Sequence, residues 1–146
     1  MSFFSEQLAR LQKSAQQRER NRIDVEGAAY ALVAEIKRCW GMNDGVRLGI
    51  ANAVDFTVNQ IRVLTDDPRG EFFVDIEFRS EHGDVWNPRF PIVATLTRGG
   101  VVMEVKDGCT HRVSVAQPAS FHPLIAELEH AVDRWISALE RSAQPQ

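Results

Sequence analysis

The sequence predicts a two-layer α+β domain: an antiparallel meander of about five to six strands follows N-terminal helices and packs one face against a long C-terminal amphipathic helix. Apolar residues repeat with a helical period near both ends of the chain and with a period of two in the middle. Face parity then requires a three-residue loop ending in glycine in each of two hairpins. With 146 residues, 44% of them hydrophobic, the chain can form one domain with its own core.

The first predicted helix runs from Ser2 to about Gln17. Its apolar residues form a narrow stripe with a spacing of four, three and four, and they are Phe4, Leu8, Leu11 and Ala15. The segment 16–22 that follows is entirely polar, so we expect it to end this helix. Residues 1–22 are therefore interpreted as a helical arm with a basic end, and residues 23–146 as a single α+β domain.

A second helix is predicted from Asp24, a residue type that suits an N-cap, to about Trp40. Its apolar face is wide enough to pack on a sheet and consists of Ala28, Ala29, Leu32, Val33, Ile36, Cys39 and Trp40. Gly41 and the following Asn-Asp-Gly cluster are expected to end it.

Alternation of apolar residues from Val46 to Val63 predicts two strands. A helix over 50–62 is an alternative, because a helical period also fits Ile50, Val54, Val58 and Ile61. Residues 66–70 contain a proline and a glycine and are predicted to form a turn.

The strand from Glu71 to Arg79 has the clearest alternation, with Phe72, Val74 and Ile76 on the face predicted to be buried. The next predicted strands are 85–97, 101–105 and 109–115. They share that face only if Phe78 lies opposite Trp86 and Val105 opposite Cys109. The loops are then 81–83 and 106–108, and a G1 bulge requires a positive φ at their last residues, Gly83 and Gly108.

Two further expectations concern the outer side of this sheet. Pro88 and Pro91 cannot donate ladder hydrogen bonds, so their strand is expected at an edge or to be bulged. The same register places Asp75 opposite Arg89, and we interpret these charges as a solvated face rather than as an acid–base pair. Use of this face to bind a partner is the less favoured alternative.

The C-terminal helix is predicted from about Ser120 to Arg141, with Pro123 in its first turn. Its broad apolar face consists of Leu124, Ile125, Leu128, Ala131, Val132, Trp135, Ile136 and Leu139. We expect Trp135, Leu128 and Leu124 to be nearly buried against the inward side chains of the sheet.

Charge and cysteine content exclude several classes of protein. A net charge of −3 gives no general affinity for nucleic acid or membranes, and no segment has the length and apolarity of a membrane span or a signal peptide. The two cysteines, Cys39 and Cys109, form no CxxC pair, which argues against a zinc site and against a disulfide framework. The 14 arginines and 3 lysines suggest a GC-rich bacterial genome, and we expect a cytoplasmic protein.

Two groups of side chains were weighed as catalytic or metal sites. Cys109 and His111 are spaced for one strand face and could form a nucleophile and its base, but both are predicted to face the core. His111, His122 and His130 lack the helical spacing of a metal pair, so a solvated helix face is the preferred interpretation of the last two. The sequence therefore predicts no catalytic residue, no metal ligand and no cofactor.

The leading functional hypothesis is a non-enzymatic protein-binding or adaptor protein, with a chaperone-like role as one form of it. It would present its N-terminal helix or the outer sheet face to a protein partner, and we expect that partner to be a second copy of the chain. The candidate binding residues are Phe4, Leu8, Leu11 and Ala15. The alternative is a carrier of a small apolar ligand, held between the sheet and the C-terminal helix near Trp86, Phe90, Met103 and Trp135. The order of elements resembles helix-grip ligand-binding folds and small acidic secretion chaperones in pattern only, and no residue role is transferred from either.

Overall fold

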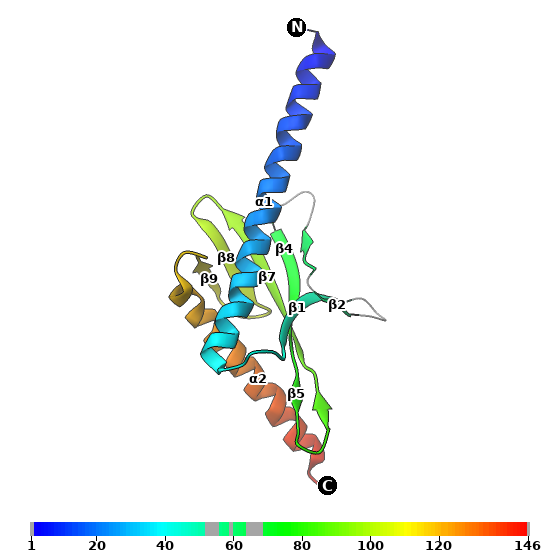
Figure 1. The fold of residues 1–146 in the computed structure, drawn as a ribbon, viewed down its shortest axis with the longest axis vertical. Helices are drawn as coiled ribbons and strands as arrows, with labels where there is room; N and C mark the ends of the chain where they lie inside the picture. Colours follow the sequence, from blue (N-terminus) through cyan, green and yellow to red (C-terminus); the bar gives the residue numbers. More distant parts are fainter. Residues whose placement is uncertain (1, 52–55, 59, 64–68, 146) are drawn as a thin grey trace.

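The computed structural model describes residues 2–51, 56–58, 60–63 and 69–145, and it is an α+β fold with a helix at each end (Figure 1). The first helix is α1 (Phe3–Trp40). The last elements are the short 3-10 helix η1 (Pro118–Phe121) and the helix α2 (His122–Ala143). The strands between them are β1 (Val46–Ala51), β2 (Phe56–Val58), β3 (Arg62–Val63), β4 (Arg69–Ile76), β5 (Phe78–Arg79), β6 (Val85–Trp86), β7 (Arg89–Thr97), β8 (Gly100–Val105) and β9 (Thr110–Val113).

The main sheet is antiparallel and has the order β2-β1-β4-β7-β8-β9. β3 pairs with β4 beyond the end of the β1–β4 ladder, and β5 and β6 form a separate two-stranded ribbon. Where two strands were predicted, the described residues of the segment 46–63 form three, β1, β2 and β3, and no helix, with Gln60 and Ile61 between the last two. Val54 and residues 66–68 of the predicted turn lie outside the described residues.

Face parity gave the correct register in both hairpins. In the first hairpin, Phe78 pairs with Trp86. In the second, Met103 pairs with His111, and the same register places Val105 opposite Cys109. Gly83 has the predicted positive φ of 89°. The prediction for Gly108 is wrong, because Asp107 takes the left-handed conformation there with φ 65°.

Glycine at position 108 has a steric explanation instead. A Cβ at this position would lie 2.9 Å from Oε2 of Glu127 and 3.0 Å from the carbonyl oxygen of Val105. The Glu127 carboxylate can therefore approach this closely only because glycine has no side chain. A substitution at Gly108 would not be penalised for a left-handed backbone conformation, since Gly108 does not have one.

The expected edge position is wrong, because Pro91 lies inside a central strand, whereas the predicted strand is interrupted at Pro88, where a bulge was the alternative. β7 lies between β4 and β8 in the centre of the sheet, and it begins only after Pro88. The carbonyl of Pro88 accepts a hydrogen bond of 3.0 Å from the N–H of Ile76, where β4 ends. The β5–β6 ribbon continues beyond this break, next to the C-terminal half of α2 (Figure 1). There the rings of Phe78 and Trp135 stack with their centroids 5.8 Å apart.

The predicted break at 16–22 is wrong, because α1 is one continuous helix. Glutamine, arginine and glutamate are good helix formers whether or not they pack against anything. Arg22 also pairs with Glu19 and Glu26, at the spacings that stabilise a helix surface. The helix begins with Ser2 as its N-cap and ends at Gly41, whose φ is 66°.

A single hydrophobic core joins the two helices to the sheet. Residues 25–36 of α1 contribute five of its most buried side chains, and η1 and α2 contribute Phe121, Leu124 and Leu128. The inward residues of the sheet include Phe72, Val74, Ile76, Ile92 and Met103. Trp135, which was expected to be nearly buried, packs only partly buried against this cluster.

Asp75 corrects the expectation of a solvated outer face. It pairs with Arg89 in the predicted register, but its side chain is fully buried. Arg47 and Arg89 contact its two carboxylate oxygens at 2.8 and 3.0 Å, and the guanidinium of Arg89 lies over the ring of Phe56, 4.2 Å from the centroid. Alternation correctly predicted that Asp75 lies on the outer face of the sheet. Side chains from neighbouring strands cover Asp75 on that face, and alternation does not predict them.

Candidate functional site

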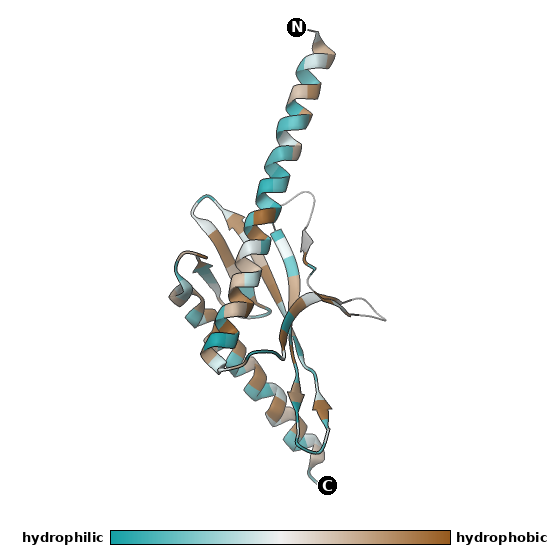
Figure 2. Ribbon diagram, in the orientation of Figure 1, coloured by the Kyte–Doolittle hydropathy of each residue, from teal (hydrophilic) through white to brown (hydrophobic). Residues whose placement is uncertain are grey.

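The first part of α1 projects beyond the sheet as a single helix (Figure 1). Its apolar residues therefore lie in solvent: Phe4 is 74% exposed, Leu11 68% and Leu8 43%. Figure 2 shows this projecting segment as largely hydrophilic, with isolated hydrophobic bands. We call Phe4, Leu8, Leu11 and Ala15 the arm stripe; all four are exposed.

The arm stripe lies on the same side of α1 as the residues that pack on the sheet. Leu11 and Ala29 are five helical turns apart at about 3.6 residues per turn, and so are Ala15 and Val33. Ala29 and Val33 are both buried in the core. One face of α1 thus continues from the core into solvent, where none of the described elements covers it.

The residues of the alternative ligand pocket do not share one environment. Met103 and Phe90 are buried in the hydrophobic core, Trp86 is 43% exposed on the β5–β6 ribbon, and Trp135 stacks on Phe78. The structure therefore places two of them in the packed interior and two at the ribbon end of α2.

A second candidate site lies where the C-terminal end of α1 meets the start of α2. Glu35 and Cys39 are four residues apart, so they lie on one side of the helix. His122 is the first residue of α2 and follows Phe121, which is fully buried. A second contact between the helices, a hydrogen bond of 3.1 Å from Nε1 of Trp40 to Oε1 of Glu129, fixes the same pairing.

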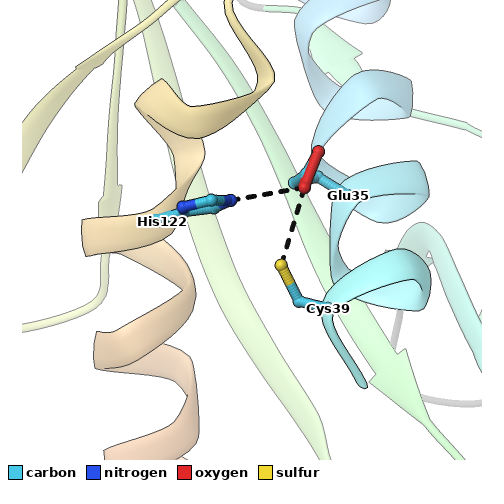
Figure 3. Close-up of side chains that lie close together, drawn as sticks. All are labelled: Glu35, Cys39 and His122. Carbon is cyan, nitrogen blue, oxygen red and sulfur yellow. Dashed lines mark hydrogen bonds and ion pairs between the residues drawn. The ribbon is translucent and has the colours of Figure 1, made fainter. Parts of the chain in front are cut away.

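Figure 3 shows that His122 and Cys39 approach the same carboxylate oxygen of Glu35. The Nε2 atom of His122 lies 3.3 Å from Oε1, and the Sγ atom of Cys39 lies 3.6 Å from it. The side chain of Glu35 is only 5% exposed, whereas His122 and Cys39 are open to solvent. Arg38 completes the group by donating from Nε to Oε1 at 2.6 Å.

The pKa values of this cluster follow from its contacts. The hydrogen bond from Arg38 lowers the pKa of Glu35 and outweighs the opposing effect of burial. Burial, followed by the hydrogen bond to Glu35, raises the pKa of the Cys39 thiol. A reactive cysteine needs the opposite shift, and its thiol would hydrogen-bond to the imidazole rather than to the carboxylate. In this cluster the thiol and the imidazole therefore both contact the carboxylate instead of each other.

The surroundings of Cys109 and His111 differ from those predicted. Cys109 is exposed rather than turned into the core, and His111 contacts Glu127 of α2, with 3.0 Å between Nε2 and Oε2. The N–H of Cys109 also donates to Oε1 of Glu127 at 3.0 Å. Burial by itself raises the pKa of Glu127, but these two partners outweigh it and lower the pKa. The pair thus fastens the β8–β9 hairpin to α2.

Sequence reasoning missed the Glu35 cluster because it tested cysteines and histidines as separate patterns. The spacing of Glu35 and Cys39 was visible, but nothing in the sequence says that His122 lies opposite them. His130, considered with His122 as a possible ligand, is exposed on α2.

No protein-family model, curated protein or solved structure matches this chain. Within the described ranges, no helix combines the length and apolarity that a membrane crossing requires. The candidate sites are therefore argued from geometry alone.

Proposed function

We propose that the protein is a non-enzymatic binding protein that associates with a second copy of itself through the arm stripe. The observation that carries this proposal is the exposure of Phe4, Leu8 and Leu11 on a helix that extends away from the domain. Leaving large apolar side chains in water forgoes about 1.5–3 kcal/mol for each side chain that could be buried.

The spacing of the arm stripe favours pairing with an identical helix. An interval of four, three and four reads the same in both directions, and it is the spacing of a coiled-coil seam. In an antiparallel pair about a two-fold axis, Leu8 therefore lies opposite Leu11, and Phe4 lies opposite Ala15. A large side chain then meets a small one at each end, and such closed two-fold pairs are the commonest protein oligomers.

The ligand-carrier alternative has less support. A carrier needs a cavity of about 300–1,000 Å³. Met103 is fully buried and Phe90 nearly so, with core side chains on both helices packed over the same sheet. No observation on these residues favours a ligand over an ordinary filled core.

Light scattering on the full chain and on a variant lacking residues 1–20 tests the proposal. We expect a dimer for the full chain and a monomer for the truncated one, with the circular dichroism of the domain otherwise retained. Equal masses for the two proteins would contradict self-association through the arm.

A matched pair of point variants locates the contact without removing the arm. Leu11→Glu places a charge in the arm stripe, whereas Ala9→Glu places it on the opposite side of the helix, about 200° away at 3.6 residues per turn. We expect Leu11→Glu to weaken dimerisation at least about tenfold, equal to about 1.4 kcal/mol, and Ala9→Glu to leave it unchanged. Similar losses in both variants would argue for general charge repulsion instead.

A further inference from the structure

We propose that Glu35, Cys39 and His122 bind a divalent transition-metal ion, with zinc as the best fit. Carboxylate oxygen, thiolate sulfur and imidazole nitrogen are the ligand types that zinc takes in proteins. The three ligand atoms come from two helices and lie within 4.8 Å of one another. Three protein ligands leave the fourth position of a tetrahedron to water.

The two separations that involve Oε1 of Glu35 agree with tetrahedral zinc. With zinc bonds of about 2.0–2.1 Å to nitrogen and oxygen and about 2.3 Å to sulfur, tetrahedral angles put nitrogen about 3.3 Å and sulfur about 3.5 Å from the oxygen ligand. The observed distances to Oε1 of Glu35 are 3.3 Å from Nε2 of His122 and 3.6 Å from Sγ of Cys39. Nε2 of His122 and Sγ of Cys39 lie within 4.8 Å of each other, and because both side chains are exposed, either can turn toward an ion bound at Oε1.

Arg38 shows that this point attracts positive charge. Its Nη2 atom forms an ion pair with Glu35, and it lies 3.4 Å from Nε2 of His122 and 3.9 Å from Sγ of Cys39. The guanidinium thus reaches all three proposed ligand atoms. Its side chain is 64% exposed, so it can turn into solvent when an ion takes its place. Arg38 is on this view a competitor of the metal ion.

A cation also resolves the hydrogen-bonding conflict at His122. Nε2 faces an acceptor, Oε1 of Glu35, and a donor, Nη2 of Arg38, and one nitrogen cannot satisfy both. With an ion bound, Nε2, the carboxylate and the thiolate all direct lone pairs at one positive centre, and the thiol proton passes to solvent. The exposed side chains of His122 and Cys39 give the ion a path of entry.

Titration of the full chain with Co²⁺, followed by displacement with Zn²⁺, tests this site. Bound cobalt should give a thiolate-to-metal charge-transfer band and the intense visible bands of tetrahedral coordination, and zinc should abolish both. Cys39→Ser and His122→Gln should weaken binding by more than about 100-fold, because even changes next to a ligand cost 10–100-fold. Cys109→Ser and His130→Gln are the matched controls and should bind as the unmodified chain does.

Arg38→Ala separates the proposal from a purely structural cluster. If Arg38 competes with the ion, its removal should tighten Co²⁺ binding roughly tenfold, since a positive charge close to the ion is lost. Absence of a charge-transfer band in the unmodified chain would overturn the proposal. So would a band that survives Cys39→Ser and disappears in Cys109→Ser.

Discussion

The two parts of α1 share one backbone and one apolar side but meet different surroundings. In residues 25–36 that side is buried between the sheet and α2, and Leu32 and Ile36 are fully covered. In residues 3–22 the same side carries Leu8 and Leu11 into solvent. Helix formation and burial are therefore separate properties in this molecule: the packed part nucleates the helix, and good helix formers extend it.

Truncation of a leucine in each part gives the largest expected contrast. Leu32→Ala should lower the free energy of unfolding by about 2–5 kcal/mol, because it leaves a cavity in the core. Leu11→Ala should change it by no more than about 0.5 kcal/mol, because the side chain contacts nothing that folding buries. Urea unfolding at low protein concentration, where association is minimal, measures both.

A large loss for Leu11→Ala under those conditions would mean that the arm packs on its own domain in solution. A loss below about 1 kcal/mol for Leu32→Ala would mean that the base of α1 does not cover the sheet. Either result would remove the difference between the two parts of the helix.

The fold could be predicted from the sequence where one local rule decides. Alternation fixed which residues share a face, so the pairing of Phe78 with Trp86 followed from parity and is confirmed. The predicted helix break failed because the polar residues of 16–22 were interpreted as a boundary, although their helix propensity is high. The polarity of residues 16–22 indicates that they are exposed to solvent, but it does not indicate where the helix ends.

Features that depend on distant side chains could not be predicted in this way. Asp75 was assigned to the outer face, but only the folded sheet brings Arg47 beside it. Glu35 and His122 are likewise neighbours only in the folded chain, because α2 begins next to the end of α1. The need for glycine at position 108 has the same origin, since Glu127 of α2 fills the space beside Gly108.

Glu19 on the arm and Glu127 in the domain should differ in how their contributions to stability depend on pH, and we expect this difference to be smaller than that between the two leucines. The hydrogen bond from Arg22 lowers the pKa of Glu19 on the arm. Burial raises the pKa of Glu127 in the domain, but the N–H of Cys109 and the His111 side chain outweigh it and lower that pKa. A lowered pKa in the folded state stabilises the fold above the ordinary glutamate pKa of about 4.3, and this contribution is lost as the pH falls through the lower, folded-state value. We expect Glu127→Gln to cost about 1 kcal/mol at neutral pH and less in acid.

Glu19→Gln is the matched control, because Glu19 is 56% exposed and pairs only with Arg22 of the same helix. Such surface pairs contribute little to stability. Urea unfolding at neutral pH and near pH 3 should therefore show a pH-dependent difference for Glu127→Gln and a much smaller one for Glu19→Gln. Equal behaviour of the two variants would show that Glu127 is as solvated as the arm.

Gly27 lies near the start of the packed part of α1, between the buried residues Val25 and Ala28, and its replacement by alanine gives the smallest expected effect. It is exposed in the helix interior, and a Cβ there has no atom within 4 Å. Alanine restricts the unfolded chain more than glycine does and costs nothing in this helix. Gly27→Ala should therefore raise the free energy of unfolding by about 0.4–1 kcal/mol and should increase the helical circular dichroism if the junction frays.

The same substitution at Gly49 should have the opposite sign, because a Cβ there would collide with the carbonyl of Thr57 and lie 2.8 Å from the ring of Phe56. A loss of stability in Gly27→Ala would contradict a continuous helix, because it would mean that position 27 needs a conformation that only glycine adopts readily. The arm would then be hinged rather than rigid, and the arm stripe would no longer keep a fixed alignment with the packed side of α1.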